Sequence, residues 1–321
     1  MTVAIVGAGA IGGLLGAHLV RAGEDVVLIA RGPHLAAMQA NGLTIRENGE
    51  EINVRPRCTD DIAQIDQANV VFITLKAHSL PAAAPAIGRS LQPDVVVVGA
   101  INGIPWWYFP DRHLESVDPG GVVARSIPSE KVIGSVVYPA ASIVAPGVIA
   151  HDEGDRFSLG EPDGTRSARV QALAKMLNAA GFKASVQTRL RNEIWLKLLG
   201  NATLNPVSAI TRATMGEMLA SDESRGAIRL LMEEVAGVAR AYGVEIPISI
   251  DRRIEGAAAA GDHKTSMLHD LESGRPLEID ALLGAVIELA DGKAVQVPGL
   301  RALYALTKLS EEVATHHRPE V

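Results

Sequence analysis

A glycine-rich turn near the start of the chain lies between a short apolar strand and an apolar helix. The β-branched run Val3–Val6 leads into Gly7-x-Gly9-x-x-Gly12, and apolar residues at helical spacing follow in 14–20. A second apolar run, Val26–Ala30, comes after the helix. Strand, glycine turn, helix and strand in this order are what a dinucleotide-binding βαβ unit requires.

The glycines and the helix start predict a phosphate site. Gly7 permits a tight turn, Gly9 lets the backbone approach a pyrophosphate, and Gly12 lets the helix pack close to the strand. The N–H groups at the helix start, together with the helix dipole, would face the phosphates. We therefore expect cofactor contacts from Gly7, Gly9, Ala10, Ile11 and Gly12.

An apolar run of this length could also be an export signal or a membrane anchor. No positively charged segment precedes it, however, and glycines, His18 and Arg21 interrupt it. Both features argue against these alternatives.

The end of the second strand predicts which dinucleotide binds. NAD sites carry Asp or Glu here, to bond the ribose 2′-hydroxyl. This chain has Arg31 instead, and its acids Glu24 and Asp25 fall before the strand. A guanidinium can clamp a 2′-phosphate, although a solvated arginine opening a loop is the alternative. The missing carboxylate favours NADP(H).

The order of the predicted elements indicates two domains. Continuous apolar strands at 70–74 and 95–98 suit a parallel sheet buried on both faces. Further strands are predicted at 132–137, 148–150 and 157–159, with an antiparallel habit, and at 182–186, while Asn48-Gly49 predicts a hairpin. From Arg189 the chain is rich in helix formers. We expect an α/β fold: a Rossmann-type doubly wound sheet in 1–187, then an all-helical domain in 188–321.

Composition excludes several classes of function. The chain has 321 residues, 47% of them hydrophobic, and a formal net charge of −7 without a basic run, which argues against a nucleic-acid partner. Cys58 is the single cysteine, so an internal disulfide and a cysteine-based metal site are excluded. We expect a cytoplasmic enzyme without a metal ion or a membrane partner.

Lys197, Asn201 and Asn205 stand four residues apart in a predicted helix and would share one face. Apolar neighbours should desolvate Lys197 and lower its pKa toward the range that a general acid needs. The asparagines could then donate to a substrate carboxylate or carbonyl. The alternative is a snorkelling surface lysine with asparagines that cap the helix end before Pro206.

Two further segments carry candidate residues. Thr265-Ser266 opens one predicted helix, and Glu278 falls in the first turn of the next. Ser266 could bind a ligand or cap its helix, and Glu278 could act in chemistry or complement the helix dipole. Lys76 and Asn102 follow predicted strands, at the sheet edge where open α/β sheets bind ligands.

Together these motifs resemble the ketopantoate reductase (2-dehydropantoate 2-reductase) family over essentially the whole chain. The motifs are Gly7-x-Gly9-x-x-Gly12, Arg31, Leu75-Lys76, Asn102-Gly103, Trp195-x-Lys197-x-x-x-Asn201-x-x-x-Asn205-Pro206, Ser266-Met-Leu-x-Asp270 and Arg275-Pro276-x-Glu278-Ile-Asp280. The resemblance implies NADPH-dependent reduction of a small 2-keto acid, in pantothenate biosynthesis, in a cleft between the two domains.

The resemblance also implies individual roles. Lys197 would act as the general acid, and Glu278 would orient that lysine or the substrate hydroxyl. The residues expected to bind substrate are Asn102, Asn201, Asn205 and Ser266. The remaining cofactor contacts are expected from Arg31, Lys76 and Asn102, and a homodimer is a further expectation.

Two features depart from the family pattern. Met215 stands where a substrate-binding asparagine often sits, and Trp106 and Trp107 follow Asn102-Gly103 in a long loop. The tryptophans could wall the substrate pocket, or could belong to loop packing or a dimer contact. Two alternatives therefore stay open: a reductase that prefers a more apolar 2-oxo acid, and a non-catalytic NADP-sensing protein, which would need neither Lys197 nor Glu278.

Overall fold

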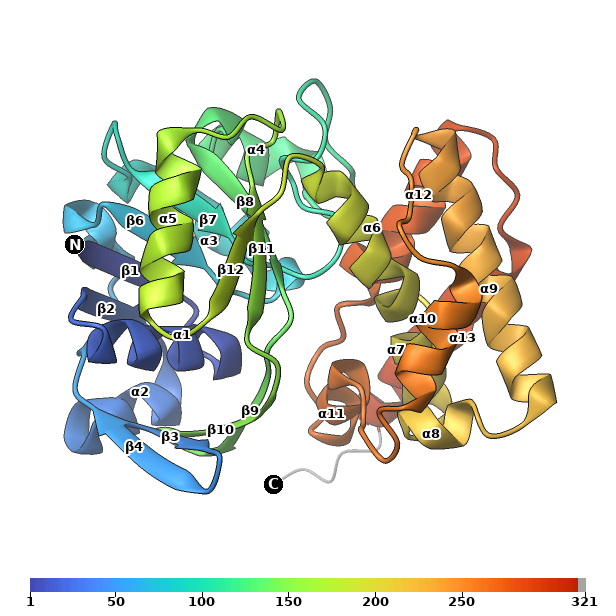
Figure 1. The fold of residues 1–321 in the computed structure, drawn as a ribbon, viewed down its shortest axis with the longest axis horizontal. Coiled ribbons are helices and arrows are strands. Elements are labelled where there is room, and N and C mark those ends of the chain that lie inside the picture. The colour runs from blue at the N-terminus through green and yellow to red at the C-terminus, as the bar shows by residue number, and fades with distance from the viewer. Residues whose placement is uncertain (317–321) are drawn as a thin grey trace. The chain divides into compact units, whose positions relative to one another are not determined.

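The computed structural model describes residues 1–316, and the chain divides into two compact units (Figure 1). Unit 1 comprises Met1–His113 and Asp118–Leu190. Unit 2 comprises the chain from Arg191 and the short segment Leu114–Val117. The sequence pattern gives no sign that 114–117 belongs with the helical part.

Unit 1 is built on an eight-stranded sheet in the order β12-β11-β8-β7-β6-β1-β2-β5. The strands are β1 (Thr2–Val6), β2 (Asp25–Ile29), β5 (Arg57–Thr59), β6 (Val70–Ile73), β7 (Val96–Gly99), β8 (Val132–Val137), β11 (Arg156–Gly160) and β12 (Lys183–Val186). From β5 to β8 all neighbours pair in parallel, whereas β11 pairs antiparallel with β8. The doubly wound sheet is confirmed. The antiparallel pairing predicted for 132–137 is wrong for one neighbour, because β8 pairs in parallel with β7. It is correct only for the other neighbour, β11.

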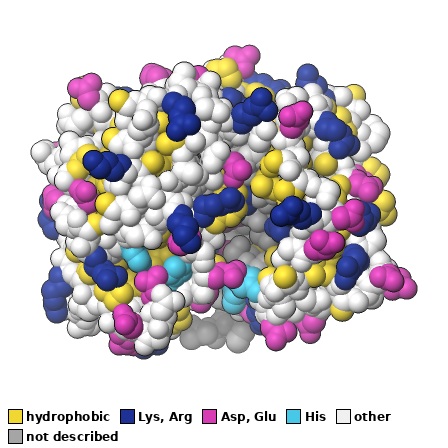
Figure 2. Space-filling model, viewed as in Figure 1, with side chains coloured by type: hydrophobic (Ala, Val, Ile, Leu, Met, Phe, Trp, Pro, Cys, Tyr) yellow, Lys and Arg dark blue, Asp and Glu magenta, His cyan; other side chains and the backbone are white. Residues whose placement is uncertain are grey.

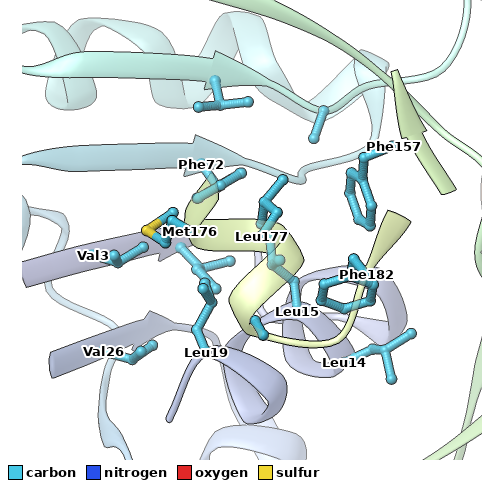
Figure 3. Packing of buried hydrophobic residues seen from close by; sticks show 14 of the residues in the cluster. Val3, Leu14, Leu15, Leu19, Val26, Phe72, Phe157, Met176, Leu177 and Phe182 are labelled. Carbon is cyan, nitrogen blue, oxygen red and sulfur yellow. The ribbon is translucent and has the colours of Figure 1, made fainter. Parts of the chain in front are cut away.

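Alternate residues of the central strands face opposite sides of the sheet, and both sides are buried. Val3 and Ile5 of β1 join the hydrophobic core cluster with residues of helices α1 (Ala10–Arg21) and α5 (Ala168–Ala179). Figure 3 shows residues of both helices in this cluster. Ala4 and Val6, which point the other way, are also buried. Burial on both faces accounts for the continuous apolar runs in the sequence.

Helix α1 packs between two sheets. The second sheet has the order β4-β3-β10-β9 and consists of β3 (Leu43–Glu47), β4 (Glu50–Val54), β9 (Ala140–Ala145) and β10 (Val148–Glu153). A Cβ on Gly16 would lie 2.6 Å from Leu28 of β2, and one on Gly13 would collide with Ile149 of β10. Because α1 is covered on both sides, His18 and Arg21 are its only polar side chains, which explains its likeness to an export signal.

The second sheet contains the predicted hairpin. Asn48 (φ 52°) and Gly49 (φ 81°) join β3 to β4, and both take the positive φ of a tight hairpin turn. The antiparallel pairing predicted for 148–150 is correct only for the pair of β10 with β9, because β10 pairs in parallel with β3.

The helices not yet named complete both units. In unit 1 they are α2 (Gly32–Asn41), α3 (Leu80–Ser90) and α4 (Val122–Ser126). In unit 2 they are α6 (Leu190–Asn201), α7 (Leu204–Thr211), α8 (Met215–Met218), α9 (Asp222–Ala241), α10 (Ile250–Ala258), α11 (Ser266–Glu272), a π-helical turn (Asp280–Gly284), α12 (Ala285–Gly292) and α13 (Pro298–His316). The all-helical character of the C-terminal part is confirmed. Within residues 1–316 no helix is long and apolar enough to cross a membrane.

Trp106 and Trp107 pack against the sheet of unit 1. Gly99 of β7 and Gly134 of β8 are register partners, and a Cβ on Gly99 would lie 3.1 Å from both indoles. The two side chains are 5% and 3% exposed, and the Nε1 of Trp106 donates to the carbonyl of Ile127 at 3.1 Å. The structure therefore favours loop packing over an open pocket wall.

The close contact between Trp107 and the sheet predicts the effect of a single methyl group. A Cβ on Gly134 would collide with the rigid Trp107 indole. We expect Gly134→Ala to lower the free energy of unfolding by about 1–3 kcal/mol, measured by urea denaturation. The control is Gly237→Ala in α9, whose Cβ would meet only the Arg240 side chain at 3.9 Å. It should be neutral or stabilise by about 0.5–1 kcal/mol, and equal losses would contradict the packing argument.

Candidate functional site

The cofactor residues predicted in unit 1 follow neighbouring parallel strands. Gly7 follows β1, Arg31 follows β2, Lys76 follows β6 and Asn102 follows β7. These four strands are adjacent in the sheet, in the order β7-β6-β1-β2. Their carboxyl ends meet at one edge, where the chain order reverses at β1, which is where open α/β sheets bind ligands.

The glycine-rich turn is held in place by Thr74, a residue that the sequence analysis missed. Its Oγ1 donates to the carbonyl of Gly7 at 2.8 Å. Gly7 has φ of 102°, and a Cβ there would lie 2.8 Å from the Leu75 nitrogen. A Cβ on Gly12 would lie 2.5 Å from the Thr74 hydroxyl. Packing within unit 1 therefore requires glycine at positions 7 and 12.

Gly9 has no such requirement from the protein itself. A Cβ there would meet only the Gly7 carbonyl, at 3.9 Å. Gly9 precedes α1, no side chain caps this helix, and its first turn carries no acid. The N–H groups of Ala10, Ile11 and Gly12 therefore start a helix with open space before it. That combination suits the phosphate of a ligand.

The cationic residues of this edge differ in their surroundings. Arg31 is exposed at the N-cap of α2, with φ of −140°, and the structure gives it no ion pair within residues 1–316. Lys76 and Asn102 are half-buried beside β6 and β7. Arg31 and Lys76 thus bring positive charge to the edge at which the sequence predicts a phosphate site.

In unit 2, Lys197 lies on α6 among buried apolar residues, with Trp195 0% and Leu198 2% exposed. Burial lowers the pKa of Lys197 from 10.5 to about 8, while the Glu278 carboxylate raises it. Lys197 is therefore protonated at neutral pH but gives up its proton readily, as a general acid must. A snorkelling surface lysine does not fit these observations.

The structure separates the three residues that the sequence places on one helix face. Lys197 and Asn201 lie on α6, which ends at Asn201, whereas Asn205 is buried near the start of α7. The prediction of one continuous helix is wrong, because Pro206 has no N–H to bond the carbonyl of Ala202.

Ser266 is the first residue of α11, as predicted, whereas Glu278 lies just before the next helical element rather than in its first turn. The cap of α11 is Thr265, whose hydroxyl accepts a backbone N–H at 3.2 Å, so Ser266 is exposed and outside the cap. Glu278 is half-buried, and its carbonyl accepts the Leu282 N–H at 3.1 Å where the π-helical turn begins. Its carboxylate acts on Lys197, so it does more than complement a helix dipole.

The sequence analysis does not predict two further contacts of unit 2, one at Gly200 and one at Asp280. The Arg253 guanidinium occupies the space that a Cβ on Gly200 of α6 would take. The Tyr304 hydroxyl donates to Asp280 at 2.5 Å. A glycine inside a helix could have indicated the first contact, because it is costly there. Nothing in the local spacing indicates the second.

On the face shown in Figure 2, basic and acidic side chains are interspersed and no large region of one sign stands out. The described part of the chain contains no group of three or more metal-ligating side chains.

Comparisons with known proteins agree along the whole chain. Family models described as "Ketopantoate reductase PanE/ApbA" and "Ketopantoate reductase PanE/ApbA C terminal" match residues 3–164 and 189–311. A 2-dehydropantoate 2-reductase of Mesorhizobium japonicum is 46% identical over 96% of this chain and 97% of its own length.

Solved structures show the same agreement. A PanE/ApbA family ketopantoate reductase of Ralstonia eutropha superposes with a TM-score of 0.87 at 30% identity, covering 98% of this chain and 100% of its own. A 2-dehydropantoate 2-reductase of Geobacter metallireducens gives a TM-score of 0.86 at 27% identity, covering 97% and 100%.

The depressed pKa of Lys197 predicts a pH-dependent cost to stability. In the folded state the buried ammonium is penalised below about pH 8, and the penalty disappears as pH rises toward the unfolded value of 10.5. We expect Lys197→Met to raise the free energy of unfolding at neutral pH by about 1–3 kcal/mol, with a gain that shrinks between pH 8 and 10.5. Denaturant titrations of both proteins across this range measure it. Lys175→Met, at an exposed position of α5, is the control, and a gain that did not vary with pH would contradict the assignment.

Proposed function

We propose that this chain, which belongs to the ketopantoate reductase family, reduces ketopantoate (2-dehydropantoate) to the 2-hydroxy acid with NADPH. The observation that carries this proposal is Lys197, a half-buried lysine among buried apolar residues, whose pKa desolvation lowers to about 8 against the raising effect of the Glu278 charge. Ketopantoate is proposed because the 46% identical relative is named for that substrate. The same chain has the glycine turn and strand-end residues that suit a dinucleotide.

Each residue has a defined task in the proposed reaction. Bound NADPH would supply the hydride for the carbonyl carbon. The Lys197 ammonium donates its proton to the carbonyl oxygen as that oxygen gains negative charge. Glu278 keeps Lys197 protonated, since its negative charge raises the pKa of the amine. Asn102, Asn201, Asn205 and Ser266 supply uncharged donors for the substrate carboxylate and hydroxyl groups.

The proposed cofactor is NADP(H) rather than NAD(H). Arg31 follows the second strand, where an NAD site would place a carboxylate. We assign residues 1–187 to cofactor binding, with contacts from the glycine turn, Arg31, Lys76 and Asn102. The helical part, 188–321, supplies the substrate residues and the proton donor.

Removing the Arg31 guanidinium should affect the affinity for NADPH and not the affinity for NADH. We expect wild-type protein to bind NADPH at least tenfold tighter than NADH, about 1.4 kcal/mol. Arg31→Ala should lose this preference while its NADH affinity stays nearly unchanged, measured by fluorescence titration. Gly9→Ala should weaken both cofactors alike, because the methyl group fills ligand space. Arg46→Ala, at an exposed residue of β3, should change neither, and equal wild-type affinities would refute the NADP assignment.

The alternatives from the sequence have less support. Trp106 and Trp107 are occupied in packing on the sheet, so Met215 is the remaining reason to expect a more apolar 2-oxo acid. Met215 begins α8, where its N–H donates to the His263 carbonyl at 2.9 Å. A sensor without catalysis would gain nothing from a destabilising buried lysine.

A substrate panel tests the proposed reaction. We expect NADPH oxidation with the highest kcat/KM for ketopantoate among 2-keto acids of graded apolar size, phenylglyoxylate included.

Lys197→Ala should lower kcat by about a hundredfold or more with NADPH affinity unchanged, since a general acid contributes on this scale. If a more apolar 2-keto acid had the highest kcat/KM, ketopantoate would be wrong as the substrate, but the proposed reductase activity would stand. Near-normal turnover in Lys197→Ala would overturn its role as proton donor.

We also propose a homodimer and a cytoplasmic location. Leu306, Leu309 and Val313 of α13 form an exposed stripe at helical spacing, 54%, 54% and 47% exposed, which suits a protein contact. Light scattering of the purified chain measures the oligomeric state. Cys58 is a free thiol, which suits a reducing compartment.

A further inference from the structure

Helix α13 presents three polar side chains to the segment that carries Glu278. Tyr304, Lys308 and Glu311 are spaced four and three residues apart, so they share one face of α13. That face contacts residues 277 and 280, which lie on either side of Glu278. None of the three belongs to the motifs that identify the family.

The contacts are specific hydrogen bonds. Glu311 Oε1 accepts the backbone N–H of Leu277 at 2.8 Å. Tyr304 donates its hydroxyl to Asp280 Oδ1 at 2.5 Å, and Lys308 Nζ lies 3.4 Å from Asp280 Oδ2. The residue before Glu278 and the residue two after it are therefore both held by the same helix.

The segment needs such anchors because it lacks regular structure of its own. Residues 275–278 lie between α11 and the π-helical turn and belong to no helix or strand. At its start, Arg275 donates its backbone N–H to the Asp270 carbonyl at 2.8 Å and its Nε to the Asp270 carboxylate at 2.9 Å. At its end comes a π-helical turn, a strained element found often at functional sites.

Tyr304 is suited to be a permanent donor. Burial, and then its hydrogen bond to Asp280, raise the pKa of Tyr304 well above its usual value. The hydroxyl therefore keeps its proton at every pH at which an enzyme of this kind is assayed. A charge-assisted bond from a neutral donor to a carboxylate is short and strong, which restricts where Asp280 can move.

We propose that Tyr304, Lys308 and Glu311 are positioning residues that fix the Glu278 carboxylate relative to Lys197. The inference rests on the proposed reductase function, in which Lys197 is the proton donor. Glu278 acts on Lys197 through its charge, and this attraction weakens with distance. A Glu278 that moves away leaves Lys197 less protonated at neutral pH and therefore a poorer proton donor.

Three substitutions and one control test the proposal. Tyr304→Phe removes the donor to Asp280, and Glu311→Ala removes the acceptor for the Leu277 N–H. Glu311→Gln keeps an acceptor oxygen and should rescue. Glu255→Ala, at an exposed position of α10, is the matched control.

Two readouts separate positioning from mere stability. The first is the pKa of Lys197, measured by NMR on protein with ¹³C-labelled lysine, its signal assigned by its loss in Lys197→Met. The second is the alkaline limb of the pH profile of kcat/KM. In Tyr304→Phe and Glu311→Ala we expect both to move to lower pH by about 0.5 or more. We also expect kcat to fall threefold to thirtyfold, with the KM for NADPH unchanged. Glu278→Gln should give the largest displacement.

The outcomes are distinct. A lower melting temperature with an unchanged Lys197 pKa would reduce Tyr304 and Glu311 to structural supports and overturn the proposal. A Glu311→Gln profile that matches Glu311→Ala would overturn the role of the Leu277 hydrogen bond. If the wild-type chain reduced no 2-keto acid, the proposed function would fail. The NMR titration would still decide whether the contacts of α13 affect the pKa of Lys197.

Discussion

Two opposing effects on one amine, burial and a nearby carboxylate, set the protonation of Lys197 in the helical unit. Burial among apolar residues of α6 drives Lys197 toward its neutral form, and the Glu278 carboxylate restores part of its charge. In the proposed role of proton donor both effects are needed, since full desolvation would leave no proton to donate and an exposed lysine would hold its proton too tightly. The surrounding packing therefore has to fix both the apolar wall and the carboxylate.

The dinucleotide turn of unit 1 depends on a different constraint, the close approach of backbones. Gly7 and Gly12 are required by contacts with Leu75, Thr74 and the turn itself, whereas Gly9 faces open space. Helix α1 lies between two sheets, so its small residues serve packing on both sides while its N-terminus stays uncapped. One helix thus joins the core of unit 1 to the place where a phosphate would bind.

Local sequence predicted the elements whose signal is local. The apolar runs of the parallel strands and the Asn48-Gly49 hairpin come from residues within a few positions of one another. It failed where pairing is decided by distant partners, as for 132–137 and 148–150, each of which pairs in parallel on one side and antiparallel on the other. Helical spacing also predicts one helix that continues past Asn201, whereas the missing N–H of Pro206 interrupts it there. The candidate site residues came from motifs, but Thr74, Asp280 and Tyr304 act through contacts that no motif contains.

The irregular segments of unit 2 share one device, a carboxylate that accepts backbone N–H groups from far along the chain. Glu234 bonds the N–H groups of Gly299 and Leu300 at the start of α13 across 65 and 66 residues, Glu311 bonds Leu277 across 34, and Glu288 bonds Ser116 across 172. The last contact explains why the segment 114–117 belongs with the helices. Charge-assisted bonds of this kind can fix a segment that has no ladder or helical hydrogen bonds of its own. Glu278 is carried on such a segment, and the proposed positioning of its carboxylate depends on Glu311 and Tyr304, far along the chain, as well as on its own neighbours.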